Sequence, residues 1–253
     1  MSKTRGLAHI EPVVWLIGVI LIWEFLSTFF IPAYILPAPS VIFYQFFTYE
    51  AMWYHFSYTL YIVLVGFVLA VVGGLMLGIL ISHSAHLQRG LSPILSGFWA
   101  TPKSAFAPLF IVWFGYGDMA SIFVVFLMAF FPLLENTMAG MRATEPELIA
   151  LMRSLRANQY QILEKVRIPK AMPYIFSGLK IAAPLTVIGA VVAEFISGYR
   201  GLGYIVLHAQ TFVKIPLTFA AILAMLIIGL CLYGAIALVE RRLLPWVRRS
   251  RSV

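Results

Sequence analysis

The 253-residue sequence has few charged residues and only one cysteine. Charged side chains make up 11% of it and hydrophobic side chains 62%, against about 25% and about 45–50% in an average soluble domain. A soluble fold of this length would expose very large apolar patches, so the composition excludes a soluble globular protein and a disordered chain. The lone Cys231 lies in an apolar run and cannot close an internal disulfide, which excludes a disulfide-stabilised scaffold.

Long apolar runs recur along the chain. A helix that crosses a bilayer needs about 20 mostly apolar residues, and six stretches reach that length. We therefore expect an all-α integral membrane protein with six transmembrane helices in a single domain, residues 1–253. The third stretch is the least regular because Pro93, Pro102 and Pro108 interrupt it. The expected spans are residues 12–31, 57–81, 91–115, 119–139, 177–196 and 216–239.

The basic residues orient these spans. Lys and Arg accumulate in cytoplasmic segments of membrane proteins, and six spans place both termini on one side. With the N- and C-termini in the cytoplasm, only Arg200 and Lys214 fall in outer loops and Lys103 falls within a span. The net charge of +8 thus needs no nucleic-acid partner, which would require a soluble basic face. The 15 basic residues on the cytoplasmic side are Lys3, Arg5, Arg89, Arg142, Arg153, Arg156, Lys165, Arg167, Lys170, Lys180, Arg241, Arg242, Arg248, Arg249 and Arg251.

An aromatic-rich outer segment, residues 32–56, follows the first span. Aromatic rings settle at the headgroup level of a bilayer. We therefore expect an interfacial helix in this segment, anchored in membrane lipid.

The longest cytoplasmic segment, residues 140–176, has a helical pattern. Thr144 is expected to cap a helix, with Pro146 in its first turn and Glu147 completing a capping box. An apolar stripe then recurs at helical spacing, either to pack on the protein's own helix ends or to dock a partner outside the membrane. The stripe consists of Leu148, Leu151, Met152 and Leu155.

A second short helix is expected after this stripe. Asn158, with Gln161 three residues later, is typical of a helix start. The pattern predicts a helix that runs towards Val166 and ends at Pro169 and Pro173. The segment therefore predicts a short helix-turn-helix with basic edges.

This segment resembles the coupling loop of permease subunits of binding-protein-dependent ABC importers. The family motif is Glu-Ala-Ala, three residues, Gly, nine residues, Ile-x-Leu-Pro, and the spacing is preserved here. Ala150 stands at the position of the Glu and Arg156 at that of the Gly, whereas Val166, Ile168 and Pro169 match the end of the motif.

Other stretches resemble the nitrate/sulfonate/taurine branch of this family, in the same order along the chain. They are Trp23-Glu24; Ile35-Leu36-Pro37-Ala38-Pro39-Ser40; Ala107-Pro108-Leu109 with Trp113-Phe114-Gly115-Tyr116-Gly117; Phe131-Pro132 with Asn136 and Gly140; Pro173-Tyr174-Ile175-Phe176-Ser177-Gly178-Leu179-Lys180; and Ala193-Glu194 followed by Gly201-Leu202-Gly203-Tyr204.

The resemblance implies a type I ABC importer permease (MetI-like) fold in the bacterial inner membrane. Two copies would form the pathway, two ATP-binding subunits would dock below, and a periplasmic substrate-binding protein would deliver the solute. The chain has no Gly-x-x-x-x-Gly-Lys-Ser/Thr phosphate loop, so we expect ATP and Mg on the partner ATPase and no cofactor, metal or catalytic residue here. The implied coupling residues are Glu147, Leu148, Ala150, Leu151, Met152, Arg153, Leu155, Arg156, Val166, Ile168 and Pro169.

Polar groups within the membrane suggest where the solute passes. Ionisable side chains in a bilayer are energetically costly and usually face a partner or a wet cavity. Lys103 and Glu194, together with Asn136, are candidates for the translocation path, although a structural ion pair or a helix-end position would explain the two charges equally well. Small residues at every fourth position predict close helix packing, mostly within one subunit. These rows are Gly66, Ala70, Gly74 and Gly78, and Gly178, Ala182, Thr186 and Ala190.

The solute itself cannot be read from these residues. The branch implies nitrate, a sulfonate, taurine or an aromatic carboxylate, and a thiamine pyrimidine precursor or riboflavin is the alternative. A self-contained secondary transporter or channel is the competing class. Such folds often contain internal repeats, and the two halves of this sequence show none. The single large cytoplasmic loop also favours an external motor.

Overall fold

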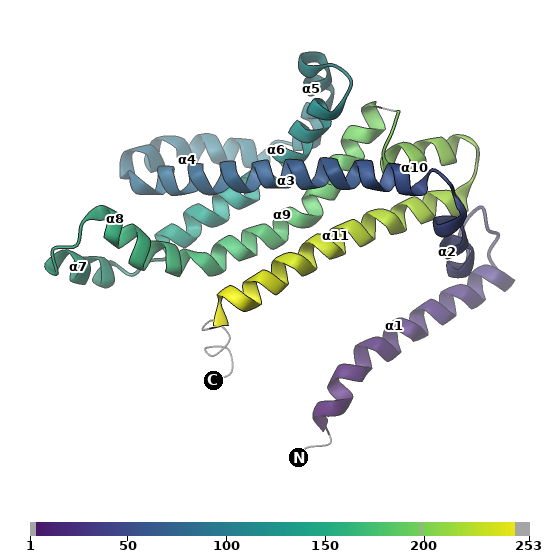
Figure 1. The fold of residues 1–253 in the computed structure, drawn as a ribbon, viewed down its shortest axis with the longest axis horizontal. Helices are drawn as coiled ribbons and strands as arrows, with labels where there is room; N and C mark the ends of the chain where they lie inside the picture. Colours follow the sequence, from purple (N-terminus) through teal and green to yellow (C-terminus); the bar gives the residue numbers. More distant parts are fainter. Residues whose placement is uncertain (1–3, 198, 246–253) are drawn as a thin grey trace.

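The computed structural model describes residues 4–197 and 199–245, which form helices joined by short connections (Figure 1). Five helical stretches are long and apolar enough to cross a membrane, and each overlaps one of the expected spans. Lys3, Arg248, Arg249 and Arg251 lie outside the described residues, as does the side chain of Arg5. The five stretches are Glu11–Phe29 within α1 (Thr4–Phe29), α3 (Met52–His83), α6 (Asp118–Arg142), Gln159–Ser197, which ends in α9 (Ile168–Ser197), and α11 (Ile215–Leu243).

The expected third span is a broken helix. It consists of α4 (Ala85–Ala100), the 3-10 turn η1 (Lys103–Phe106) and α5 (Ala107–Phe114). The break falls at Pro102, which has an extended backbone (φ −68°, ψ 100°). Proline has no N–H to donate to the preceding turn, so the helix ends before it. Neither α4, with 16 residues, nor α5, with 8, is long enough to cross a bilayer alone.

Two short helices lie in the segments that were expected to face outward. The first, α2 (Pro39–Thr48), confirms the helix expected after the first span, and its Ile42 and Phe46 are buried. Its start is held by Glu24 of α1, whose carboxylate accepts hydrogen bonds from the backbone N–H (3.0 Å) and the hydroxyl (2.6 Å) of Ser40. The second, α10 (Leu202–Thr211), was not expected from the sequence.

The centre of the bundle is α6, which packs between α3 and α9. Glycines permit this closeness: a Cβ on Gly74 would lie 2.9 Å from the Cβ of Leu133, and one on Gly178 would lie 2.8 Å from the Cβ of Asn136. Both small-residue rows therefore pack within the chain, as expected. By contrast, only 6% of the residues in the most apolar stretch of α1 are buried, against 61% in that of α6.

The segment between α6 and α9 contains the two expected short helices, α7 (Pro146–Ser154) and α8 (Gln159–Ile162). The predicted capping box at Asn158 and Gln161 is confirmed in both directions. The predicted cap at Thr144 is wrong. Glu145 occupies the N-cap position without a side-chain bond, and the Thr144 hydroxyl donates instead to the carbonyl of Met141 at 3.4 Å.

The prediction that Pro169 and Pro173 end the helix is also wrong. A π-helical turn, Leu163–Arg167, joins α8 to α9 without interruption. In this turn the N–H of Ile168 reaches back five residues to the carbonyl of Leu163. The wider turn accommodates the missing N–H of Pro169. The connection between α6 and α9 is therefore residues 143–167, shorter than the expected 140–176.

Candidate functional site

The α7–α8 hairpin projects from the end of the bundle, on the left in Figure 1. No residue of α7 is buried. The apolar stripe is accordingly open: Leu151 is 55% exposed and Leu155 69% exposed, while Leu148 and Met152 are half-buried. Tyr160 of α8 adds a further exposed ring. An uncovered apolar face outside the long helices is a surface that a partner can bury.

The end of α7 is closed by a left-handed residue. Arg156 has φ 58°. The N–H of Ala157 donates to the carbonyl of Met152, and that of Arg156 donates to the carbonyl of Arg153, both at 2.9 Å. This pair of bonds is a Schellman motif, in which glycine is the usual left-handed residue. Arg156 stands where the family motif has its glycine, so the backbone conformation is kept although the residue type is not.

The second half of the motif fastens the hairpin to the bundle. Ile162 is buried, and Leu163 packs with Met141, Ala171 and Ile175. An ion pair of 2.8 Å between Lys170 and Glu145 joins the start of α9 to the start of α7. The hairpin is thus held at its base and free at its tip.

The remaining predicted coupling residues divide between these two regions. At the tip, Glu147, Ala150 and Arg153 are exposed on α7. At the base, Val166 and Ile168 are half-buried, and Pro169 is exposed in the first turn of α9. The structure therefore places all eleven residues in one hairpin and its root.

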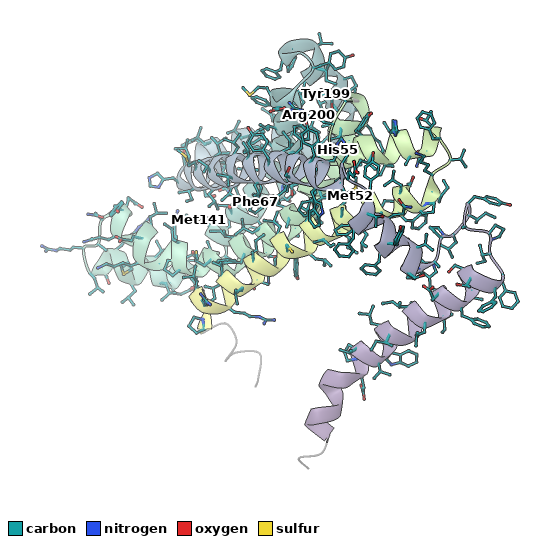
Figure 2. The ribbon with its side chains drawn as sticks, turned by 45° about the vertical axis from the view of Figure 1, so that its right-hand side comes forward. Met52, His55, Phe67, Met141, Tyr199 and Arg200 are labelled. Atoms are coloured by element: carbon teal, nitrogen blue, oxygen red, sulfur yellow. The ribbon has the colours of Figure 1, made fainter. Side chains whose placement is uncertain are left out.

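At the opposite end of the bundle lies a buried polar cluster around Glu194 of α9. Figure 2 shows His55 and Arg200 at this end and Met141 at the other. The Glu194 side chain is fully buried. Its carboxylate accepts a hydrogen bond from the Thr59 hydroxyl at 2.6 Å and one from the N–H of Gly203 at 2.7 Å.

A second cluster lies beside it, nearer the surface. The guanidinium of Arg200 pairs with Asp118 at 2.6 Å and lies over the ring of Tyr58, 4.3 Å from its centroid. The Tyr58 hydroxyl donates to the same carboxylate at 3.0 Å. This pairing could not be predicted from the sequence, because Asp118 is 60 positions from Tyr58 and 82 from Arg200.

The three candidates for the translocation path lie on three different elements. Lys103 is in η1, with its ammonium nitrogen 5.5 Å from the centroid of the Phe131 ring. Asn136 is in α6, and its amide nitrogen donates to the carbonyl of Pro132 at 2.8 Å. Glu194 is the third, and its carboxylate is engaged within the chain as described above.

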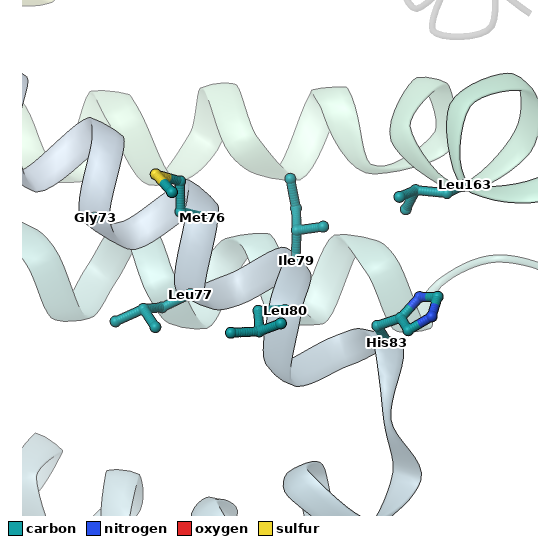
Figure 3. Close-up of a pocket in the computed structure, with 7 residues that line it drawn as sticks. All are labelled: Gly73, Met76, Leu77, Ile79, Leu80, His83 and Leu163. Atoms are coloured by element: carbon teal, nitrogen blue, oxygen red, sulfur yellow. The ribbon is translucent and has the colours of Figure 1, made fainter. Parts of the chain in front are cut away.

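An apolar recess of about 690 Å³ flanks the half of α3 that ends at His83 (Figure 3). Only His83 brings a polar side chain to its wall, so the recess by itself offers little to bind a polar solute. Within the part of the chain that the structure describes, no group of three or more His, Cys, Asp or Glu side chains is placed to hold a metal ion. The recess is lined by Gly73, Met76, Leu77, Ile79, Leu80, His83 and Leu163.

The chain is similar to known transport proteins over most of its length. Residues 70–245 match the family described as "Binding-protein-dependent transport system inner membrane component". A probable ABC transporter permease protein of Haemophilus influenzae is 38% identical over 224 residues, 87% of this chain and 91% of the relative. The formylaminopyrimidine transport permease protein ThiX of Halalkalibacterium halodurans is 31% identical over 97% of this chain and 99% of its own.

Other relatives have different named solutes. A putative aliphatic sulfonates transport permease protein of Bacillus subtilis is 32% identical over 90% of this chain and 84% of its own. Riboflavin, taurine and nitrate permeases also match. Among solved structures, an amino acid ABC transporter has a similar fold, with a TM-score of 0.58 and 20% identity over 73% of this chain and 90% of that one.

Proposed function

This chain belongs to the family of binding-protein-dependent transport system inner membrane components, and from that premise we propose how it works. It is an ABC importer permease of the nitrate/sulfonate/taurine branch and a multi-pass inner membrane protein. In our proposal two copies form the pathway, each pairs with one of two ATP-binding subunits, and a periplasmic binding protein delivers the solute. ATP and Mg would be bound by the ATPase subunits and not by this chain.

The exposed stripe of the hairpin is the observation that carries this proposal. Leu151 and Leu155 are mostly exposed on a helix that has no buried residue of its own. A solvated connector needs no such stripe. We propose that these leucines, with Leu148 and Met152, fill an apolar groove on the ATPase, and that Glu147, Arg153 and Arg156 make polar contacts at its rim.

The absence of a carboxylate at position 150 bears on this docking. Relatives with the full motif have a Glu at this point, whereas Ala150 has no group that accepts a hydrogen bond. Glu147 is exposed one turn earlier on the same helix, and residues three apart on a helix share a face. We propose that Glu147 supplies the missing negative charge to the ATPase.

The hairpin is built to transmit force. Converting a two-state equilibrium almost completely takes about 5.5 kcal/mol of differential binding, and a loose contact would not deliver it. Here Val166, Ile168 and Pro169 lie in the uninterrupted helical stretch Gln159–Ser197, which links the hairpin to the membrane bundle. Movement of the docked hairpin would therefore move α9 directly.

The solute would pass between polar groups of the two copies. We propose that Lys103 and Asn136 lie beside the path and that Glu194 acts on it through α10. A lysine at the break of a helix within the membrane is suited to attract an anion, which favours nitrate, a sulfonate, taurine or an aromatic carboxylate. Similarity to the formylaminopyrimidine permease over almost the whole of both chains favours a thiamine pyrimidine precursor as the second candidate.

Leu151→Asp tests the docking. We expect the variant to insert normally but to lose co-purification with the ATPase and ATP-dependent uptake, because a buried unpaired carboxylate would oppose contact with an apolar groove. Asn158→Asp is the matched control: it adds the same charge to an exposed position of the same hairpin outside the stripe, and an aspartate can still accept the bond from the Gln161 N–H. Normal uptake and normal co-purification of Leu151→Asp would refute the assignment. A wild-type chain that transports alone would favour a self-contained transporter.

A further inference from the structure

The first turn of α10 is capped by side chains from two other helices. Three consecutive backbone N–H groups each have a separate acceptor. Gly201 donates to Nδ1 of His55 at 3.0 Å, Leu202 to the Thr59 hydroxyl oxygen at 2.8 Å, and Gly203 to the Glu194 carboxylate at 2.7 Å. His55 and Thr59 are one turn apart on α3, and Glu194 lies near the end of α9.

These acceptors replace a cap that the local sequence does not supply. The first N–H groups of any helix lack partners within it, and Ser, Thr, Asp or Asn normally provides one at the N-cap. The N-cap here is Gly201, which has no side chain and has φ 105°. A Cβ at this position would overlap the Glu194 carboxylate. The glycine thus admits the carboxylate, and the carboxylate does the capping.

The charge of Glu194 suits this place. A helix N-terminus carries a partial positive charge that stabilises an anion. The Thr59 hydroxyl donates to the other carboxylate oxygen at 2.6 Å, and it also accepts from Leu202, so the three groups form one network. All three of Glu194, Thr59 and His55 are buried. Removing any of them would leave a buried N–H without a partner.

Arg200 fastens the chain just before α10 to the same region. Its ion pair with Asp118 reaches the first residue of α6, and its contact with the Tyr58 ring reaches α3. The position of α10 is therefore determined by α3, α6 and α9 together. Of these helices, α9 also has the docking hairpin at its other end.

We propose that Glu194 is a positioning residue for transport, which holds α10 to the outer end of α9 so that this outer helix follows movements that begin at the cytoplasmic hairpin. The inference rests on the proposed function, because it assigns a role to a connection between the hairpin and the outer face. The helical stretch Gln159–Ser197 is that connection, with the hairpin at its start and Glu194 three residues from its end.

Amide hydrogen exchange of the assembled transporter in lipid nanodiscs tests the capping directly. In Glu194→Ala we expect the amides of Leu202 and Gly203 to exchange about tenfold faster or more, as loss of a hydrogen bond to a charged group predicts. Thr59→Val should accelerate the exchange of these amides similarly. In the double variant the acceleration should be well below the product of the two single accelerations, because both residues belong to one network. Ser121→Ala is the control, since that buried hydroxyl bonds only within α6, to the carbonyl of Gly117.

The ratio of solute transported to ATP hydrolysed tests the role in transport. We expect Glu194→Ala to lower this ratio several-fold, whereas general misfolding would lower both rates together. Glu194→Gln keeps the side-chain volume and one acceptor oxygen, so we expect its ratio to lie between those of the wild type and of Glu194→Ala. This variant provides the test if the alanine variant does not fold. An unchanged ratio, or unchanged exchange at Leu202 and Gly203, would overturn the inference. A wild-type chain without ATP-dependent transport would instead refute the proposed function, and the exchange result would still report on the cap.

Discussion

The residue that departs most from its expected type is Arg156. It stands in the left-handed region at the end of α7, where a side chain destabilises the backbone by about 1–2 kcal/mol. The two bonds of the Schellman motif hold it there. The hairpin thus keeps the shape of the family motif at the expense of local stability.

We expect Arg156→Gly to stabilise the hairpin. Glycine removes the left-handed strain, but its greater flexibility in the unfolded chain lowers the free energy of unfolding by about 0.4–1 kcal/mol. The net gain in the stability of the hairpin should therefore be about 0.5–1 kcal/mol. Slower hydrogen exchange of the Ala157 amide would show it. The control is Ala150→Gly in the middle of α7, which should accelerate exchange because glycine in a helix interior costs about 1 kcal/mol relative to alanine. Equal acceleration in both variants would contradict the strain argument.

Among the elements, α3 and α6 lie so close together that they leave little room for added volume. Gly74 faces Leu133 so closely that a Cβ would have to displace it, whereas a Cβ on Gly234 of α11 would meet nothing within 4 Å. The same substitution at both positions separates packing from helix propensity, which favours alanine at each.

We expect Gly74→Ala to lower the thermal midpoint of the purified protein and Gly234→Ala to leave it unchanged or to raise it. Overpacking of a close contact costs about 1–3 kcal/mol, which exceeds the gain of about 1 kcal/mol in helix propensity. Thermal unfolding followed by size-exclusion chromatography measures both. A Gly74→Ala midpoint at or above that of the wild type would contradict the close packing.

The elements also show what can be predicted from sequence. Apolar length located the five long helices, and side-chain type located the cap at Asn158, because both signals are local. The continuous helix across Pro169 was not predictable in this way, since it depends on a π-helical turn. Nor was α10, whose first turn depends on His55 and Thr59, far away in sequence.

The same distinction applies to the functional residues. The stripe from Leu148 to Leu155 could be predicted because helical spacing is a local pattern, and the structure leaves it open. The network that joins Glu194 to α3 could not be predicted, because its bond with Thr59 joins residues 135 positions apart. The burial of the Glu194 carboxylate alone would suggest a large energetic cost. Its hydrogen bonds with Thr59 and Gly203 explain why it is tolerated.

At the scale of the whole molecule, α1 is the least buried of the five long helices. It touches the rest of the chain near its C-terminal end, where Glu24 bonds to Ser40 and the ring of Trp23 lies 6.4 Å from that of Phe219. Its other faces are apolar and exposed. In the proposed assembly those faces meet lipid or the second copy.

The path of the chain between α3 and α6 decides the topology of the whole molecule. Together α4 and α5 contain 24 residues in helix, about 36 Å at 1.5 Å per residue, enough for a hydrocarbon core of about 30 Å. If this broken helix crosses the membrane, the chain crosses six times. In the orientation expected from the basic residues, α1 then starts and α11 ends on the cytoplasmic side.

Cysteine labelling resolves this topology. In a Cys231→Ser background we expect Tyr116→Cys to react with a membrane-impermeant maleimide from outside intact cells and Leu87→Cys to react only in inverted vesicles; both positions are exposed. The background chain alone should not label. Reaction of both positions from one side would mean that α4 and α5 re-enter the membrane without crossing it. The chain would then cross five times, and the start of α1 and Arg89 of α4 would lie on the face opposite the hairpin.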